Sequence, residues 1–146
     1  MSIRQILYTS QALQPVTKED CRALLTQARE NNLRDGLTGM LIFVTNGTFL
    51  QVLEGASDKL QCTMQRITRD PRHEHLGIIL DIQVEARSFG DWSMAFQSCD
   101  PEDLADHKRF WNFGRQQDFR SLAKSGPPIM SVMRQICLAN VRSLTA

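Results

Sequence analysis

Short apolar runs alternate with segments of helical periodicity along the first two thirds of the chain. Runs typical of β-strands occupy residues 3–10, 40–44, 48–54, 78–85 and 92–96. Two segments, residues 17–32 and 57–69, instead place apolar residues every three or four positions, as an amphipathic helix does. The order strand, helix, strand, strand, helix, strand, strand predicts an α+β fold built on one sheet.

Local signals support the ends of these elements. A T-x-x-D box from Thr17 to Asp20 is typical of a helix N-terminus, and the pair Asn31-Asn32 is typical of a helix end. An Asn-Gly pair at 46–47 indicates a hairpin turn, because both residues tolerate positive φ. The second and third strands are therefore expected to form a β-hairpin.

The βαββαββ order is that of a ferredoxin-like sheet with one extra strand. In this topology the first and third strands are central neighbours, and right-handed crossovers place both helices on one face. Two polar residues interrupt the core-facing positions of these strands, Tyr8 in the first and Gln51 in the third. Because buried polar groups need hydrogen-bond partners, we expect the two side chains to meet. The gap between the helices would then be a slot for a flat ligand.

The last third of the chain predicts a helical tail. Residues 1–98 form the predicted domain, and residues 99–146 form two further helices separated by a Ser-Gly-Pro-Pro break at 125–128. We expect this extension to cover the sheet face that the two core helices leave bare. Its second apolar stripe, at 129–144, is expected to form a homo-oligomer contact or a partner surface. The tail is too short to hold a separate effector domain.

Composition narrows the function classes. The 146-residue chain carries a net charge of +1, which gives no electrostatic reason to expect nucleic acid or a membrane surface as partner. It shows neither a signal peptide nor a run of apolar residues long enough to span a membrane, so a cytoplasmic location is expected. The histidines lack metal-ligand spacing, and no metal is expected. A structural role is expected for the four widely spaced thiols, Cys21, Cys62, Cys99 and Cys137.

Several motifs together resemble the BLUF family of flavin-based blue-light sensors. They are LYTS at 7–10, ENN at 30–32, GLTGMLIF at 36–43, FLQVLEG at 49–55, ITRDPRH at 67–73 and RSFGDWSMAF at 87–96. The resemblance covers residues 1–98 and implies a flavin bound without a covalent bond between the two helices. The implied cofactor is FAD, with FMN or riboflavin as alternatives.

The resemblance also implies a photoactive group of four residues. Tyr8 would donate a hydrogen bond to Gln51, Gln51 would face the flavin, and Trp92 and Met94 would line the Gln51 side. Light would drive electron and proton transfer from Tyr8, and Gln51 would remain rotated or tautomerised after the charges recombine. When an amide rotates by half a turn, its NH₂ donors and its oxygen acceptor exchange places. The new hydrogen bond to the flavin carbonyl would then shift the flavin absorbance to the red. The last strand and the tail would pass this change to a downstream protein.

A second implied group would hold the cofactor. Asn31 and Asn32 would bind a carbonyl edge of the ring, and four further residues would contact the far edge, the ribityl chain or the phosphates. The full implied binding set is Asn31, Asn32, Gln51, Arg66, Asp70, Arg72 and His73.

Each of these residues also has an ordinary structural interpretation when it is taken alone. Tyr8 could be a packed strand tyrosine, Gln51 a sheet-edge amide, and Arg66 with Asp70 a surface pair one helical turn apart. Two other functions remain as alternatives, a small flavoenzyme active in the dark and a ligand-free ferredoxin-like interaction module. The sequence contains no nucleophile elbow, no paired acid and base carboxylates and no Gly-rich phosphate loop. We therefore expect a sensor and not an enzyme.

Overall fold

A computed structural model describes residues 2–44, 47–90, 93–99 and 133 of the chain. The elements are β1 (Ile3–Ala12), α1 (Lys18–Asp35), β2 (Thr38–Val44), β3 (Thr48–Gly55), α2 (Ser57–Arg69), β4 (His73–Val84) and β5 (Ala95–Cys99). The element order predicted from the sequence is confirmed.

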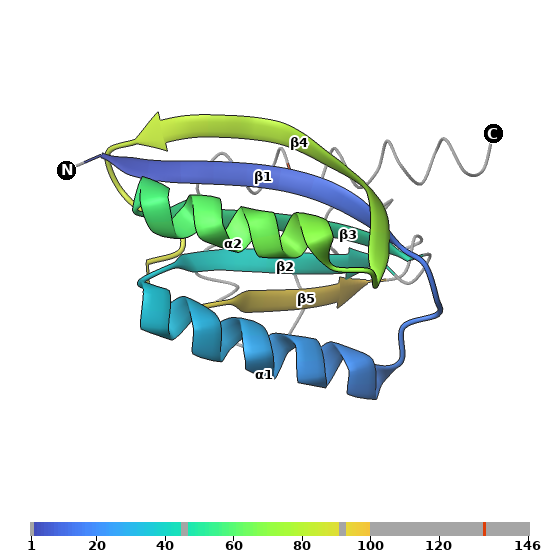
Figure 1. The fold of residues 1–146 in the computed structure, drawn as a ribbon. Coiled ribbons are helices and arrows are strands. Elements are labelled where there is room, and N and C mark those ends of the chain that lie inside the picture. Colours follow the sequence, from blue (N-terminus) through green and yellow to red (C-terminus); the bar gives the residue numbers. More distant parts are fainter. Residues whose placement is uncertain (1, 45–46, 91–92, 100–132, 134–146) are drawn as a thin grey trace.

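The strands form one sheet in the order β4-β1-β3-β2-β5. β1 pairs with β3 and β4, and β3 with β2, all antiparallel, whereas β5 is parallel to β2. Both helices lie on the same face of the sheet, α2 over its β1 side and α1 toward β5 (Figure 1). The predicted ferredoxin-like arrangement, with the first and third strands as neighbours, is therefore confirmed.

α1 begins at a complete capping box. The hydroxyl of Thr17 accepts from the amide of Asp20, and the Asp20 carboxylate accepts from the amide of Thr17, both at 3.0 Å. The helix continues past Asn31-Asn32 to Asp35 and ends at Gly36, whose φ of 68° suits glycine. The prediction that the Asn pair ends the helix was wrong, and Asn32 lies on its buried side.

One apolar cluster joins the two helices to the sheet. The helices contribute Leu25, Leu60 and Met64, all of them buried. The sheet contributes alternate strand residues, among them Ile6, Tyr8, Leu41, Phe43, Phe49 and Leu53. Phe43 and Phe49 stack with ring centroids 4.9 Å apart at a tilt of 39°. This core holds α1 and α2 in place over the central strands.

The last two strands differ in part from the prediction. β4 begins at His73, and its apolar residues Ile78, Ile79 and Ile82 are exposed at the sheet edge. β5 begins at Ala95, so the predicted strand start at residue 92 was wrong, and Trp92 lies outside the described residues. The hairpin turn is described only at Gly47, whose φ is 101° and whose amide donates to Val44 at 2.8 Å.

Residues on the sheet face away from the helices are also buried, including Leu7, Met40, Ile42, Leu50 and Val52. The predicted tail helices and the break between them lie outside the described residues, apart from Met133. Met133 is helical and fully buried. The tail's role in covering this face stays a prediction.

Two observations bear on thiols and membranes. Cys21 is half-buried against the core, but Cys62 is exposed, so the expectation of a structural role was wrong for Cys62. The Cys99 side chain and Cys137 lie outside what the structure describes. In the described part of the chain, no helix has both the length and the apolar character needed to cross a bilayer.

Candidate functional site

Tyr8 and Gln51 meet at the centre of the sheet. They are directly opposite each other in the β1–β3 register, and both side chains face the helices. The Tyr8 hydroxyl donates a short hydrogen bond to Oε1 of Gln51. Both residues are buried, at 4% and 6% exposure. The predicted contact between these two polar side chains is confirmed.

Met94 occupies the other side of the Gln51 amide. Nε2 of Gln51 donates to the Met94 sulfur at 3.5 Å, and Met94 is buried. A thioether is a weak acceptor, so this contact orients the amide without holding it firmly. Gln51 is therefore placed between a strong partner, Tyr8, and a weak one, Met94.

Side chains of α1 hold the backbone beside Met94. Nδ2 of Asn32 donates to the carbonyl of Ser93 at 2.7 Å, and Nε of Arg29 donates to the carbonyl of Met94 at 3.0 Å. The Asn32 oxygen has no partner among the described residues, although Asn32 is only 3% exposed and lines the cavity described next. Buried polar atoms without partners are rare, so this oxygen is a candidate ligand contact.

A cavity of about 610 Å³ lies between α1, α2 and the sheet. Its size and its mainly apolar lining are typical of a small-molecule site. Among the residues predicted to bind a cofactor, all seven line it: Asn31, Asn32, Gln51, Arg66, Asp70, Arg72 and His73. Tyr8 lines it as well, while Trp92 lies outside the described residues. The slot expected from topology is thus present, with apolar walls and polar groups at defined places.

Burial controls the chemistry of the Tyr8 phenol. The pKa of Tyr8 is raised above its usual value of 10.0, first by burial and second by the negative charge of Asp70. The phenol therefore stays protonated at neutral pH, and its O–H group donates the hydrogen bond to Gln51. A neutral phenol with a hydrogen-bonded acceptor can lose an electron and a proton together.

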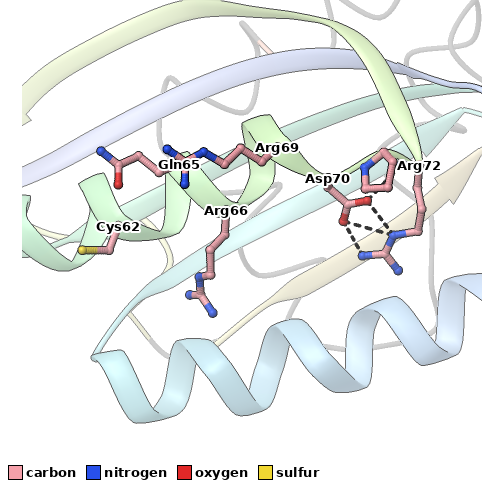
Figure 2. A pocket seen from close by; sticks show the side chains of 7 residues that line it. Cys62, Gln65, Arg66, Arg69, Asp70 and Arg72 are labelled. Atoms are coloured by element: carbon pink, nitrogen blue, oxygen red, sulfur yellow. Dashed lines mark hydrogen bonds and ion pairs between the residues drawn. The ribbon is translucent and has the colours of Figure 1, made fainter.

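The outer end of the cavity carries charge. Arg72 and Asp70 form an ion pair at 2.5 Å, and hydrogen bonding from Arg72 is the main reason that the pKa of Asp70 is lowered. Arg66 pairs with Asp35 of α1 at 3.5 Å, so the surface pairing of Arg66 with Asp70 considered from the sequence was wrong. Figure 2 shows Arg66 directed toward α1 and Asp70 turned toward Arg72.

An open groove continues outward from this end along α2. It has a volume of about 680 Å³ and is lined by Cys62, Gln65, Arg66, Arg69, Asp70, Pro71 and Arg72. Arg66, Asp70, Pro71 and Arg72 line both the groove and the cavity. Arg69, which no sequence motif marks, also lines the groove (Figure 2), and no hydrogen bond or ion pair joins its side chain to another described residue. The groove therefore presents an excess of positive charge.

His73 closes the β1 side of the cavity. Its Nδ1 lies 2.8 Å from the hydroxyl of Ser10, and its Nε2 lies 2.5 Å from the carbonyl of Ile67. A carbonyl only accepts, so Nε2 carries a proton. His73 ties the end of α2 to β1. Its predicted contact with a cofactor stays a prediction.

Two contributors to the site were missed by sequence reasoning. Arg29 looks like any exposed helical arginine, and no pattern links it to Met94, 65 positions later. Ser93 contributes only its backbone carbonyl, which any residue type would supply, so the amino-acid sequence gives no indication of this role. Within the described residues no cluster of His, Cys, Asp and Glu could hold a metal ion.

Comparison with known proteins gives one family. Residues 3–95 match the model of BLUF, described as sensors of blue light using FAD. Photoactivated adenylate cyclase subunit beta of Euglena longa is 31% identical over 99% of this chain, and its counterpart in Euglena gracilis is 32% identical. The chain spans only 16% of the length of these two relatives.

Solved structures agree with the family match. BlrB, a BLUF protein in its dark state, superposes with a TM-score of 0.68 at 26% identity, over 94% of this chain and 97% of that one. The photo-activated state of BlsA gives a TM-score of 0.61 at 29% identity, over 67% of this chain and 70% of that one. These likenesses cover the fold that carries Tyr8, Gln51 and the cavity.

Proposed function

This chain belongs to the BLUF family of blue-light sensors, and on that premise we propose that Tyr8 and Gln51 are its photoactive pair. The observation that carries the proposal is the buried hydrogen bond from Tyr8 to Gln51 at the floor of the cavity. Met94 and Asn32 complete the group, since one contacts the Gln51 amide and the other offers a buried oxygen without a partner among the described residues.

A flavin suits this cavity on chemical grounds. A flat ring with apolar faces and polar edges matches apolar walls that carry a few polar groups. Asn31, Asn32 and Gln51 would bind polar edges of the ring, while Arg66 and Arg72 lie at the outer end of the cavity and His73 lines its β1 side. When bound, the flavin supplies absorption of blue light and an excited state that is a strong oxidant.

The protein's own contribution is the response of two side chains. Tyr8 would give up an electron to the excited flavin, and its proton would move along the hydrogen bond to Gln51; both would return to the phenol when the charges recombine. Gln51 is left rotated or tautomerised, so that its donor and acceptor atoms have changed places. If the amide rotates, the Met94 sulfur, which accepts from Nε2 in this structure, would face Oε1. A new hydrogen bond toward the cofactor would produce the red shift.

The cofactor form is proposed to be FAD. The basic groove leads out of the cavity, and it offers the three guanidinium groups of Arg66, Arg69 and Arg72. Arginine binds phosphate through paired N–H donors, and FAD, unlike riboflavin, carries phosphates. The shared lining of cavity and groove supports one ligand that extends through both.

The output is proposed to pass through β5 and the segment after it to a downstream protein. Solved light-regulated adenylyl cyclases share this fold, which supports a sensor that acts on an effector. We take the chain itself to have no catalytic activity and to assemble as a homo-oligomer. Size-exclusion chromatography with light scattering, in the dark and under blue light, tests the assembly.

One measurement tests the function. The purified protein should show a flavin spectrum that shifts slightly to the red after blue light and recovers in the dark. Tyr8→Phe should bind flavin equally well and give no shift, because the phenolic proton is gone. A bound flavin that only bleaches, or that a substrate reduces in the dark, would contradict the sensor and favour a flavoenzyme. A protein that takes up no flavin would favour the interaction module.

A further inference from the structure

A buried carboxylate lies near the end of β3, three residues after Gln51. Glu54 is 0% exposed, and it lies on the sheet face opposite to Gln51 because side chains alternate along a strand. Four donors reach its two oxygens: the Thr38 hydroxyl at 2.8 Å, the Gln5 amide at 3.2 Å, the Ser88 amide at 2.8 Å and the Phe89 amide at 2.6 Å. A carboxylate accepts about this many hydrogen bonds, so the group is fully satisfied.

Two of the four donors belong to the loop between β4 and β5. The carboxylate binds consecutive backbone amides, those of Ser88 and Phe89, and the Phe89 ring is buried at 1% exposure. Arg87 adds three further bonds from the loop, to the Thr38 hydroxyl at 2.9 Å, the Glu54 carbonyl at 3.3 Å and the Gly36 carbonyl at 2.8 Å. The start of the loop is therefore fixed to the ends of β2 and β3.

The end of the same loop contacts the photoactive pair. Met94 lies against Gln51, and the carbonyls of Ser93 and Met94 accept from side chains of α1. The loop thus runs from Glu54 to Gln51, two residues of one strand that face opposite sides of the sheet.

We propose that Glu54 is a positioning residue for the light response, which holds the β4–β5 loop so that Met94 stays against Gln51 and which couples the state of Gln51 to that loop. The inference rests on the proposed function, and it goes beyond it by giving a role to a residue that contacts neither cofactor nor photoactive pair. A purely structural carboxylate would affect stability and leave the lifetime of the light state alone.

The test replaces the carboxylate by an amide. Glu54→Gln keeps the size of the side chain, but its NH₂ group cannot accept, so at least one loop amide loses its partner. With the loop loosened, Gln51 should turn back more easily, and the red-shifted state should recover in the dark about threefold faster or more, a modest drop in barrier. Flavin occupancy and the dark spectrum should stay unchanged.

Asp81→Asn is the matched control. It makes the same chemical change in a carboxylate that pairs with Arg4 at 2.7 Å on the helix side of the sheet, without contact to the loop. Recovery in this variant should equal that of the unmodified chain. If the unmodified chain and Asp81→Asn show no red shift, the proposed function fails. If both show it, and folded Glu54→Gln recovers at their rate, only the role of Glu54 is refuted.

If Glu54→Gln does not fold, hydrogen exchange in the unmodified chain tests whether the loop held by Glu54 responds to light. The amides of Ser88 and Phe89 should exchange slowly in the dark and faster under continuous blue light. The Leu60 amide, bonded to Ala56 at 2.9 Å at the start of α2, serves as the reference that light leaves unchanged. Equal exchange at Ser88 and Phe89 in dark and light would overturn the proposal.

Discussion

Tyr8 is the single tyrosine of the chain, so its titration can be followed without interference from any other phenol. Its pKa is raised by burial and by the charge of Asp70, while the unfolded chain ionises near the ordinary value of 10. Above that pH the unfolded state binds fewer protons than the folded state, so the free energy of unfolding must fall as pH rises further. Below pH about 10 the contribution of protonated Tyr8 to the free energy of unfolding is fully present.

We therefore expect no tyrosinate absorbance from the folded protein as pH passes 10, followed by a cooperative rise when the chain unfolds. Tyr8→Phe should remove this part of the pH dependence of stability. The measurement is an ultraviolet absorbance titration with circular dichroism on the same samples. Tyrosinate that appears near pH 10 while the circular dichroism stays native would show that the phenol is not buried as described.

Arg69 tests whether the bound flavin carries a phosphate. If its guanidinium binds a phosphate, Arg69→Gln should weaken the affinity for FAD by about threefold to tenfold at low salt, and less at high salt, since the site is exposed. The affinity for riboflavin should not change.

Arg22→Gln provides the control for Arg69, because Arg22 is exposed on α1 and lines neither the cavity nor the groove. Fluorescence titration of the protein freed of flavin gives both affinities. If Arg69→Gln lowered the affinities for FAD and riboflavin equally, the substitution would act through the fold and not through a phosphate contact.

At the level of helices and strands, periodicity was enough to place every predicted core element, including the extent of α2. It could not place the end of α1, the start of β4 or the start of β5. α1 runs on to Gly36, a local signal for a helix end that was overlooked, whereas β5 starts only after Ser93 and Met94, whose carbonyls accept from Asn32 and Arg29 of α1. These are contacts between segments about 60 residues apart, which local propensity does not report.

The candidate site was predictable where its residues are polar intrusions in apolar strands, as Tyr8 and Gln51 are. Glu54 offered a similar signal, an acidic residue after Leu50 and Val52 on alternate positions of β3, and its importance was overlooked. The ion pairs of Arg66 with Asp35 and of Asp70 with Arg72 could not be predicted from helical spacing. They depend on how the helices sit over the sheet.

Gly39 determines how closely β2 approaches β3. A Cβ there would overlap the backbone oxygen of Val52, next to Gln51, and backbone cannot move aside at small cost. Gly39→Ala should lower the free energy of unfolding by about 1–3 kcal/mol or more.

Gly77 is the matched control for Gly39. It lies in β4 without positive φ, and no atom lies within 4 Å of the place that a Cβ would take. Gly77→Ala should therefore be neutral or stabilise by up to about 1 kcal/mol through a smaller entropy of the unfolded chain. Denaturant titration of both variants measures the difference. Similar stabilities of Gly39→Ala and Gly77→Ala would show that β2 and β3 can move apart at small cost. Gln51 would then be held less rigidly than described.

For the whole molecule, the central question is what buries the second face of the sheet. Both helices occupy the other face, yet Leu7, Ile42, Leu50 and Val52 are at most 1% exposed (Figure 1). An apolar sheet face of this size is not left in water by a stable domain. Met133, the one described residue beyond position 99, is fully buried. This supports the expectation that the segment after β5 belongs to the folded unit.

If that expectation is correct, Met133 contributes to the stability of the sensor domain. Met133→Ala should then lower the free energy of unfolding by about 2–5 kcal/mol, the range for a buried methionine truncated to alanine. Leu33→Ala, at a side chain that is 78% exposed on α1, should change it by about 0.5 kcal/mol or less. Denaturant unfolding followed by tryptophan fluorescence and by bound flavin should give one coincident transition. Two separate transitions, or equal effects of the two substitutions, would mean that the tail folds independently. In that case the light-induced change at Gln51 could not be passed to a partner through a docked tail. β5 alone would have to transmit it.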